Sequence, residues 1–178
     1  MAVRESLLGI LTLGPAYGLQ LHFELGSRAP HRRKTNVGQI YGTLERLTQA
    51  GLVQHDGFTS DGLPLYCLTT AGFSQAEAWL AGDDVPIMNS APDWSDFLDH
   101  VLISRSIEAD AASQLISRYR DLFAGLISAT ELDLSGKAEQ HYLLAAQSWL
   151  DDAEQDIEVA EVPYQDNRPK RGRPKTAS

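Results

Sequence analysis

A basic stretch followed at once by a polar helix face is the part of this sequence with the clearest chemistry. Arg32, Arg33 and Lys34 stand together, and behind them apolar and polar residues alternate at helical spacing. Clustered cations suit phosphate groups, and short polar side chains suit hydrogen bonds to base edges in a DNA major groove. The pattern therefore predicts a DNA-contacting surface within residues 32–46.

The residues of this surface divide into two predicted roles. Gln39 and Thr43 are the candidates for base contact. Asn36 is a further predicted DNA contact, and it stands three residues before Gln39, which is a capping-box spacing for the start of a helix. The candidates for phosphate contact are Arg32, Arg33, Lys34, Tyr41 and Arg46. The alternative is an ordinary solvated helix face that does not touch DNA.

A second basic segment lies near the end of the chain, over residues 168–175. Its centre, Arg171, Gly172 and Arg173 followed by Pro174, resembles the AT-hook. Glycine lets the backbone sit deep in a narrow A·T minor groove, while the two arginines extend along its floor. The alternative is a disordered basic tail with only non-specific attraction to phosphates.

Helical and strand periodicities place these residues in a mainly α fold with a small β-hairpin wing. Apolar spacing predicts helices over 3–13, 18–28 and 36–50, short strands over 52–55 and 64–68, and a further helix over 70–80. Three helices followed by a hairpin form a winged helix-turn-helix. We therefore predict a winged helix-turn-helix DNA-binding domain over 1–81, a linker over 82–92, a helical dimerisation domain over 93–162 and a basic disordered tail over 163–178.

The helical region after the linker carries apolar seams that predict a homodimer. One seam repeats at steps of three and four from Ala112 to Ala129, which is a heptad pattern. Two long helices and a short one do not easily hide both seams within a monomer. The predicted dimer contacts are Leu115, Tyr119, Leu122, Leu126, Tyr142 and Trp149.

Charge is strongly segregated along the 178 residues, whose net charge is −9. Residues 1–80 hold six Lys/Arg and six Asp/Glu, residues 81–167 hold four and 18, and residues 168–178 hold five and none. The whole-chain charge argues against a nucleic-acid partner, but its distribution favours double-stranded DNA, with A·T-rich flanks for the tail.

Three separated motifs resemble the PadR family of bacterial transcriptional regulators. They are Pro15-x-Tyr17-Gly18, then Tyr41-x-x-Leu44-x-x-Leu47-x-x-x-Gly51-Leu52, and Tyr66-x-Leu68-Thr69-x-x-Gly72. The resemblance implies a dimeric DNA-binding repressor that a small molecule releases from its operator. The wing departs from the family, because Leu63 and Leu65 stand where the family usually has basic residues. The alternative function is a winged-helix module for protein–protein interaction without sequence-specific DNA binding.

The remaining chemistry-bearing residues predict no enzyme. The chain shows no phosphate-cradling glycine loop, nucleophile elbow or metal-ligand spacing, so we expect no catalytic residues, metal or cofactor. Cys67, the single cysteine, excludes an intrachain disulfide and is expected to act as a small buried hydrophobe. Trp94 is the candidate contact for a small aromatic effector, with a core position as its alternative. Without a spanning segment or signal sequence, the expected location is the bacterial cytoplasm, on the nucleoid when bound to DNA.

Overall fold

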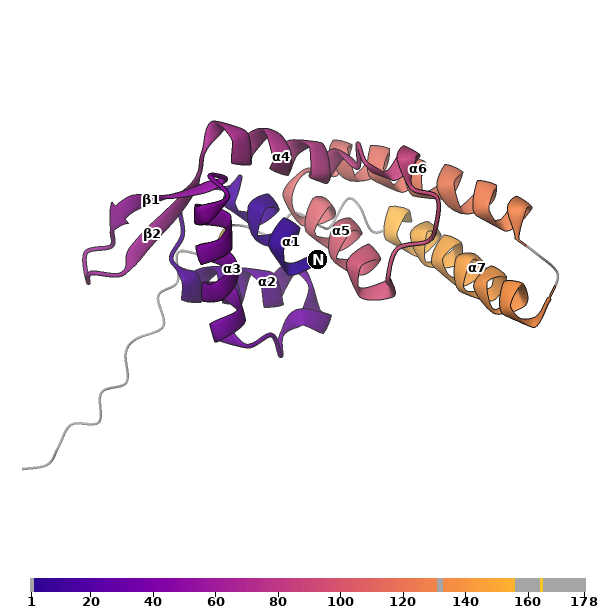
Figure 1. Cartoon of the computed structure of the whole chain (residues 1–178), viewed down its shortest axis with the longest axis horizontal. Coiled ribbons are helices and arrows are strands. Elements are labelled where there is room, and N and C mark those ends of the chain that lie inside the picture. Colours follow the sequence, from indigo (N-terminus) through magenta and orange to yellow (C-terminus); the bar gives the residue numbers. More distant parts are fainter. Residues whose placement is uncertain (1, 131–132, 156–163, 165–178) are drawn as a thin grey trace, which may run out of the picture.

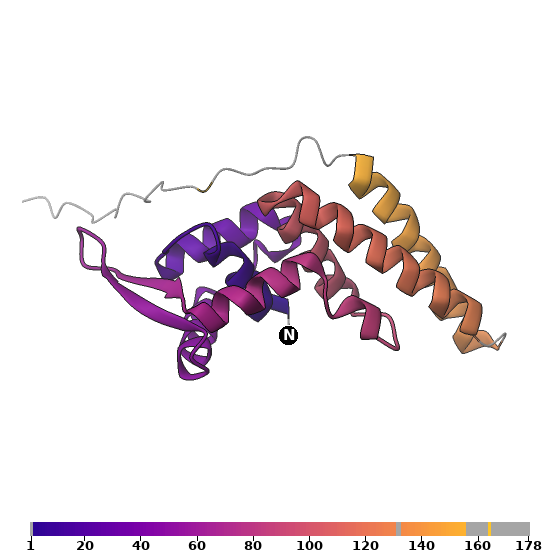
Figure 2. The same cartoon turned by 90° about the horizontal axis from the view of Figure 1, so that it is seen from above.

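The computed structural model describes residues 2–130, 133–155 and 164, and they form an elongated, mainly helical molecule. The hairpin projects from one end, the α6–α7 pair forms the other end, and α5 lies between them (Figures 1 and 2). In chain order the elements are α1 (Ala2–Leu11), α2 (Gly18–Arg28), η1 (Pro30–Arg32), α3 (Val37–Gln49), β1 (Val53–Phe58), β2 (Pro64–Leu68), α4 (Thr70–Ala81), η2 (Val85–Ile87), α5 (Trp94–Ile107), α6 (Ala109–Ala129) and α7 (Leu134–Gln155).

The first three helices and the hairpin confirm the predicted winged helix-turn-helix. Ile40, Leu44 and Leu47 on one face of α3 are fully buried, as their spacing requires. Asn36 caps α3 by accepting a hydrogen bond from the N–H of Gly38 at 2.7 Å. Strands β1 and β2 are antiparallel, with Val53 opposite Leu68 and an irregularity between His55 and Phe58.

A tight contact joins the wing to α4. Thr69 caps this helix by accepting from the N–H of Gly72 at 3.1 Å. A Cβ atom at Gly72 would lie 1.9 Å from the carbonyl oxygen of Leu52, at the start of the wing. Only glycine lets the two backbones approach so closely, and this approach sets the direction in which α4 leaves the hairpin.

Helix α5 belongs to both hydrophobic cores of the molecule. Ile103 packs into the core of the winged helix, whereas Phe97 and Val101 pack into the core between α5, α6 and α7. Leu98 and Leu102 are only half-buried, whereas the polar residues Asp99 and His100 of the same helix are buried. Helix α5 follows the predicted linker at 82–92 but packs into the core of the domain that precedes this linker as well as into the core of the C-terminal helices. The predicted domain boundary therefore stays a prediction.

Much of the apolar seam of α6 is covered by the chain's own helices. Leu115 and Tyr119 are buried with Phe123 against α5 and α7. This burial leaves neither Leu115 nor Tyr119 with a surface to offer a partner, which corrects their prediction as dimer contacts. The predicted contacts that stay half-buried are Leu122, Leu126, Tyr142 and Trp149.

Two absences concern the described part of the chain. Every helix within residues 2–130 and 133–155 is too short or too polar to span a bilayer. Within the same residues, no group of three or more histidine, cysteine, aspartate or glutamate side chains could hold a metal ion.

Candidate nucleic-acid interface

The outer face of α3 is polar. Gln39, Tyr41 and Arg46 lie on its exposed side, as predicted. Glu45 lies on the same side, and Gly38 and Gly42 contribute no side chains there. A Cβ atom at Gly42 would meet nothing within 4 Å, so the backbone is open to close approach by a partner.

Thr43 does not lie on this outer face. Only 3% of its surface is exposed. Its hydroxyl donates to the carbonyl of Gln39 at 2.8 Å and accepts from the Arg46 guanidinium at 3.0 Å. These contacts correct the prediction that Thr43 reads a base and give it a positioning role for Arg46.

Tyr41 is 41% exposed and closes the space between α3 and the start of α2. A Cβ atom at Gly18 would lie 2.5 Å from the Tyr41 ring, so glycine is required for the ring to pack there. On its other side, Tyr41 borders a shallow hollow of about 360 Å³ shared with His55 and Tyr66 of the wing. The Tyr41 phenol therefore lies between the helices α2 and α3 on one side and the wing on the other.

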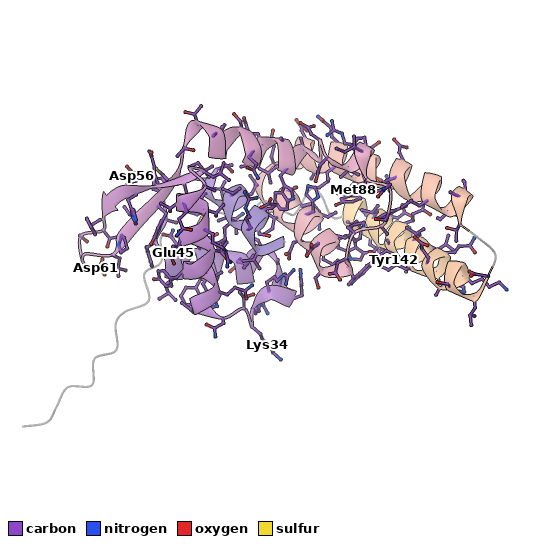
Figure 3. All side chains as sticks on the ribbon, viewed as in Figure 1. Lys34, Glu45, Asp56, Asp61, Met88 and Tyr142 are labelled. Carbon is purple, nitrogen blue, oxygen red and sulfur yellow. The ribbon has the colours of Figure 1, made fainter. Side chains whose placement is uncertain are left out.

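The basic loop after α2 carries three cationic side chains. One is held by an ion pair within the protein, and two remain at the surface. The Nε of Arg32 donates to both carboxylate oxygens of the buried Asp99, at 3.0 and 2.9 Å, so α5 holds this guanidinium. Arg33 is exposed, although its Nε donates to the carbonyl of Gly26 at 3.2 Å. Lys34 stands at the tip of the loop and points away from the body (Figure 3). Arg32 is therefore a poorer candidate for phosphate contact than its two neighbours.

A hollow of about 330 Å³ beside α3 gathers three arginines from distant parts of the chain. Arg4 of α1, Arg32 of η1 and Arg46 of α3 all line it, together with Gln39 and Asp96. Sequence reasoning missed Arg4, because nothing in the local pattern of α1 shows that its first turn packs beside α3. The hollow offers guanidinium groups next to the exposed polar face.

The wing contributes no cation to this surface. Residues 53–68 contain no lysine or arginine but include Asp56 and Asp61, which Figure 3 labels on the hairpin. Leu63 and Leu65, at the departure from the family pattern, are half-buried. The wing would therefore repel phosphates weakly rather than hold them.

The comparison with family models gives a match over the N-terminal part of the chain. Residues 7–78 match the model described as the transcriptional regulator PadR-like family. Residues 7–78 are a PadR-like domain. This is a family of transcriptional regulators and not of enzymes, and the match runs from α1 to α4.

Among solved structures, the crystal structure of Bacillus subtilis PadR in complex with operator DNA is similar to this chain. The two are 18% identical, the alignment covers 88% of this chain and 99% of that one, and the TM-score is 0.43. No match was found among curated protein sequences.

Behind the PadR-like domain lies a cavity of about 520 Å³ that the sequence did not predict. It is bordered by the apolar and aromatic side chains of Trp79, Met88 and Tyr119, and by His100. Trp79 stacks on His100 with the ring centroids 4.5 Å apart and the planes 10° from parallel. Trp94 is not among the lining residues, because its ring packs in the aromatic cluster with Phe97, Tyr142 and Trp149.

Several carboxylates surround the cavity. Asp83, Asp84 and Asp96 border it, and Asp83 is paired with Arg118 at 2.6 Å. Glu5 of α1 is ion-paired with Arg4. Within the described residues its second oxygen, Oε2, is buried without a hydrogen-bond partner. Burial raises the pKa of Glu5 above its ordinary value, against the opposing effect of Arg4.

The remaining predicted contacts, Arg171, Gly172 and Arg173, lie outside the described residues. Cys67 is half-buried on β2 and forms no disulfide, so it is less enclosed than expected.

Proposed function

We propose that this regulator binds operator DNA with the exposed face of α3 and the loop that precedes it. The observation that carries the proposal is the open polar face of α3, where Gln39 and Arg46 are exposed and two glycines leave the backbone accessible. A helix of this composition suits a major groove, where close approach and hydrogen bonds to base edges give specificity. A protein-docking module would need neither the glycines nor the cations of the adjoining loop.

Phosphate contacts come from the cations that remain available around α3. Arg33 and Lys34 extend from the loop, and Arg46 borders the hollow beside the helix. Such contacts fix the register of the helix without reading sequence. The C-terminal basic tail supplements them, because the wing carries only acidic charges.

The protein acts as a homodimeric repressor in this proposal. Apolar side chains stay uncovered in the C-terminal half, where Leu134 is 86%, Leu144 48% and Trp94 38% exposed. Covering these side chains with a second copy would remove apolar surface from water. A two-fold dimer presents two α3 helices to half-sites about 34 Å apart, or a multiple of this distance.

A small aromatic effector relieves repression by entering the 520 Å³ cavity. Trp79 and His100 offer a stacked aromatic wall for a planar ligand. Helix α5 connects this cavity to the DNA-contacting loop, because His100 borders the cavity while its neighbour Asp99 holds Arg32 and His31. A ligand that shifts α5 would therefore also move the loop.

The proposed DNA contact is tested by removing the two cations of the loop. In a gel-shift titration with a duplex covering the promoter of the protein's own gene, R33A/K34A should bind more weakly than the parent. Its plot of log K against log salt should be shallower by about two units, at about 0.9 per phosphate contact. Lys137→Ala removes an exposed lysine of α7 and is the matched control, which should keep the parent slope.

Two results would contradict this assignment. An unchanged slope in R33A/K34A would show that the loop does not contact phosphates. Failure of the folded parent protein to shift the promoter duplex would instead favour the protein-docking module.

A further inference from the structure

We propose that Tyr164 is an anchor that holds the start of the C-terminal tail on the PadR-like domain, beside the wing. Its hydroxyl donates to the carbonyl of Gly14 at 3.2 Å and lies 3.4 Å from the carbonyl of Pro15. The half-buried ring packs against the hydrophobic core of the winged helix. A residue near the C-terminus thus contacts the turn between α1 and α2, about 150 positions earlier in the chain.

The turn that receives Tyr164 is a rigid part of the domain. Gly14 has a φ of +140°, which favours glycine, and Pro15 restricts the next backbone angle. Ala16 is joined to Tyr66 of β2 by two backbone hydrogen bonds, at 3.0 and 2.9 Å. The carbonyls that meet the Tyr164 hydroxyl therefore precede a residue locked to the base of the wing.

The position of Tyr164 is not a consequence of the helix that precedes it. Helix α7 ends at Gln155, and Ala153 in its last turn belongs to the core of the C-terminal half. Tyr164, nine residues after Gln155, packs against the core of the N-terminal half. A phenol with both ring packing and a hydroxyl contact supplies the interaction that holds Tyr164 on the winged helix.

The anchor determines where the basic tail starts. Gly172, the centre of the Arg-Gly-Arg-Pro segment, stands eight residues after Tyr164, so it can reach at most about 27 Å from the anchor. Without the anchor the tether would begin at Gln155, 17 residues before Gly172. Because effective concentration falls as about the −3/2 power of tether length, the anchor raises it about threefold near the wing.

The partner of the anchored tail is the A·T-rich minor groove that flanks the half-site of the same chain. The wing beside the anchor carries Asp56 and Asp61 and no cation, so the tail supplies the positive charge that this side of the interface lacks. This part of the inference rests on the proposed DNA binding, whereas the docking of Tyr164 itself does not.

The docking is tested first in the free full-length protein by NMR. Tyr164→Ala should shift the backbone amide signals of residues 13, 14, 16 and 17 and of Tyr66 on the wing, because the ring is lost from this surface. Tyr164→Phe keeps the ring and should shift mainly the signals next to the Gly14 carbonyl. Unchanged amide signals at residues 13, 14, 16 and 17 in Tyr164→Ala would overturn the proposal, whether or not the protein binds DNA.

The effect on DNA is tested by a double-mutant cycle on a promoter duplex with A·T-rich flanks. Tyr164→Ala in the full chain should raise Kd about threefold, and deletion of residues 168–178 should raise it further. In the deletion variant, Tyr164→Ala should have no additional effect, because no tail remains to be positioned. An equal loss with and without the tail would show that Tyr164 acts through the domain and would overturn the anchor. Absence of binding by every form would refute the proposed function, while the NMR result still decides the docking.

Discussion

The fold keeps the buried imidazole of His100 in its neutral, singly protonated form. Its Nε2 faces the carbonyl oxygen of Trp79, which can only accept, so Nε2 carries the proton. Nδ1 then accepts from the hydroxyl of Tyr119 at 2.8 Å. Burial lowers the pKa of His100 to about 4, although the Trp79 carbonyl and the charge of Asp84 act in the opposite direction.

This burial predicts a loss of stability in acid. The unfolded chain takes up a proton at the ordinary histidine pKa of about 6.5, whereas the folded protein does so only near 4. The unfolded state therefore binds more protons as the pH falls from about 6.5 to 4, and the folded state loses stability through this window. Between pH 7.5 and 5.0, His100 should cost about 2 kcal/mol in the free energy of unfolding.

Urea unfolding of the parent and of His100→Gln at these two pH values measures the contribution. Glutamine cannot be protonated in this range, so the variant should lose about 2 kcal/mol less than the parent. His141→Gln, at an exposed position of α7, is the control and should follow the parent. An identical loss in His100→Gln and the parent would refute the assignment.

At the scale of elements, α5 is the structural link between the PadR-like domain and the C-terminal half. Asp99 is fully buried and accepts from Arg32, while His31 lies 2.8 Å from the same carboxylate. About two turns farther along α5, the Ser106 carbonyl accepts from Arg28 of α2 at 2.8 Å. These contacts tie the basic loop to a helix that also borders the cavity.

Asp99→Asn should therefore weaken this link. Loss of the carboxylate charge leaves Arg32 with a weaker partner, and we expect a decrease of about 2 kcal/mol in the free energy of unfolding. Asp121→Asn, at an exposed position of α6, is the matched control and should change stability by less than about 0.5 kcal/mol. Equal unfolding free energies of the two variants, measured in urea, would show that the Asp99 contacts do not stabilise the loop.

At the scale of the whole molecule, ion pairing within the protein limits how many lysine and arginine side chains can contact DNA. Residues 1–80 hold six lysines and arginines, but three of them are paired within the protein. Arg4 is paired with Glu5, Arg28 with Glu24 and Arg32 with Asp99. The neutral winged helix thus presents few free cations, and the five in residues 168–178 become a large share of those available.

Deleting residues 168–178 should accordingly flatten the plot of log K against log salt by up to about four units. Duplexes that differ only in A·T-rich or G·C-rich flanks separate the two interpretations of the tail. An AT-hook-like segment predicts that the full chain prefers A·T flanks and that the deletion removes this preference. A non-specific basic tail predicts the same change of slope without a preference, and an unchanged slope would contradict both.

The sequence by itself determined the elements and their buried faces. Apolar spacing predicted the helix over 36–50 that became α3, and it predicted the two short strands of the hairpin. Asn36 was correctly placed at a helix start, although its partner is the N–H of Gly38 and not that of Gln39. Such features depend on neighbours within a few positions, so the local pattern contains them.

Only the tertiary structure decided which elements cover one another. Thr43 lies at the edge of the apolar face of α3, and helical spacing alone does not show how far the packing extends. Arg32 is captured by Asp99, 67 positions away, and Leu115 and Tyr119 are covered by the chain's own helices. The cavity beside His100 likewise depends on the angle between helices. Periodicity identifies the side of a helix that avoids water, but the partner that covers it depends on the packing of the whole chain.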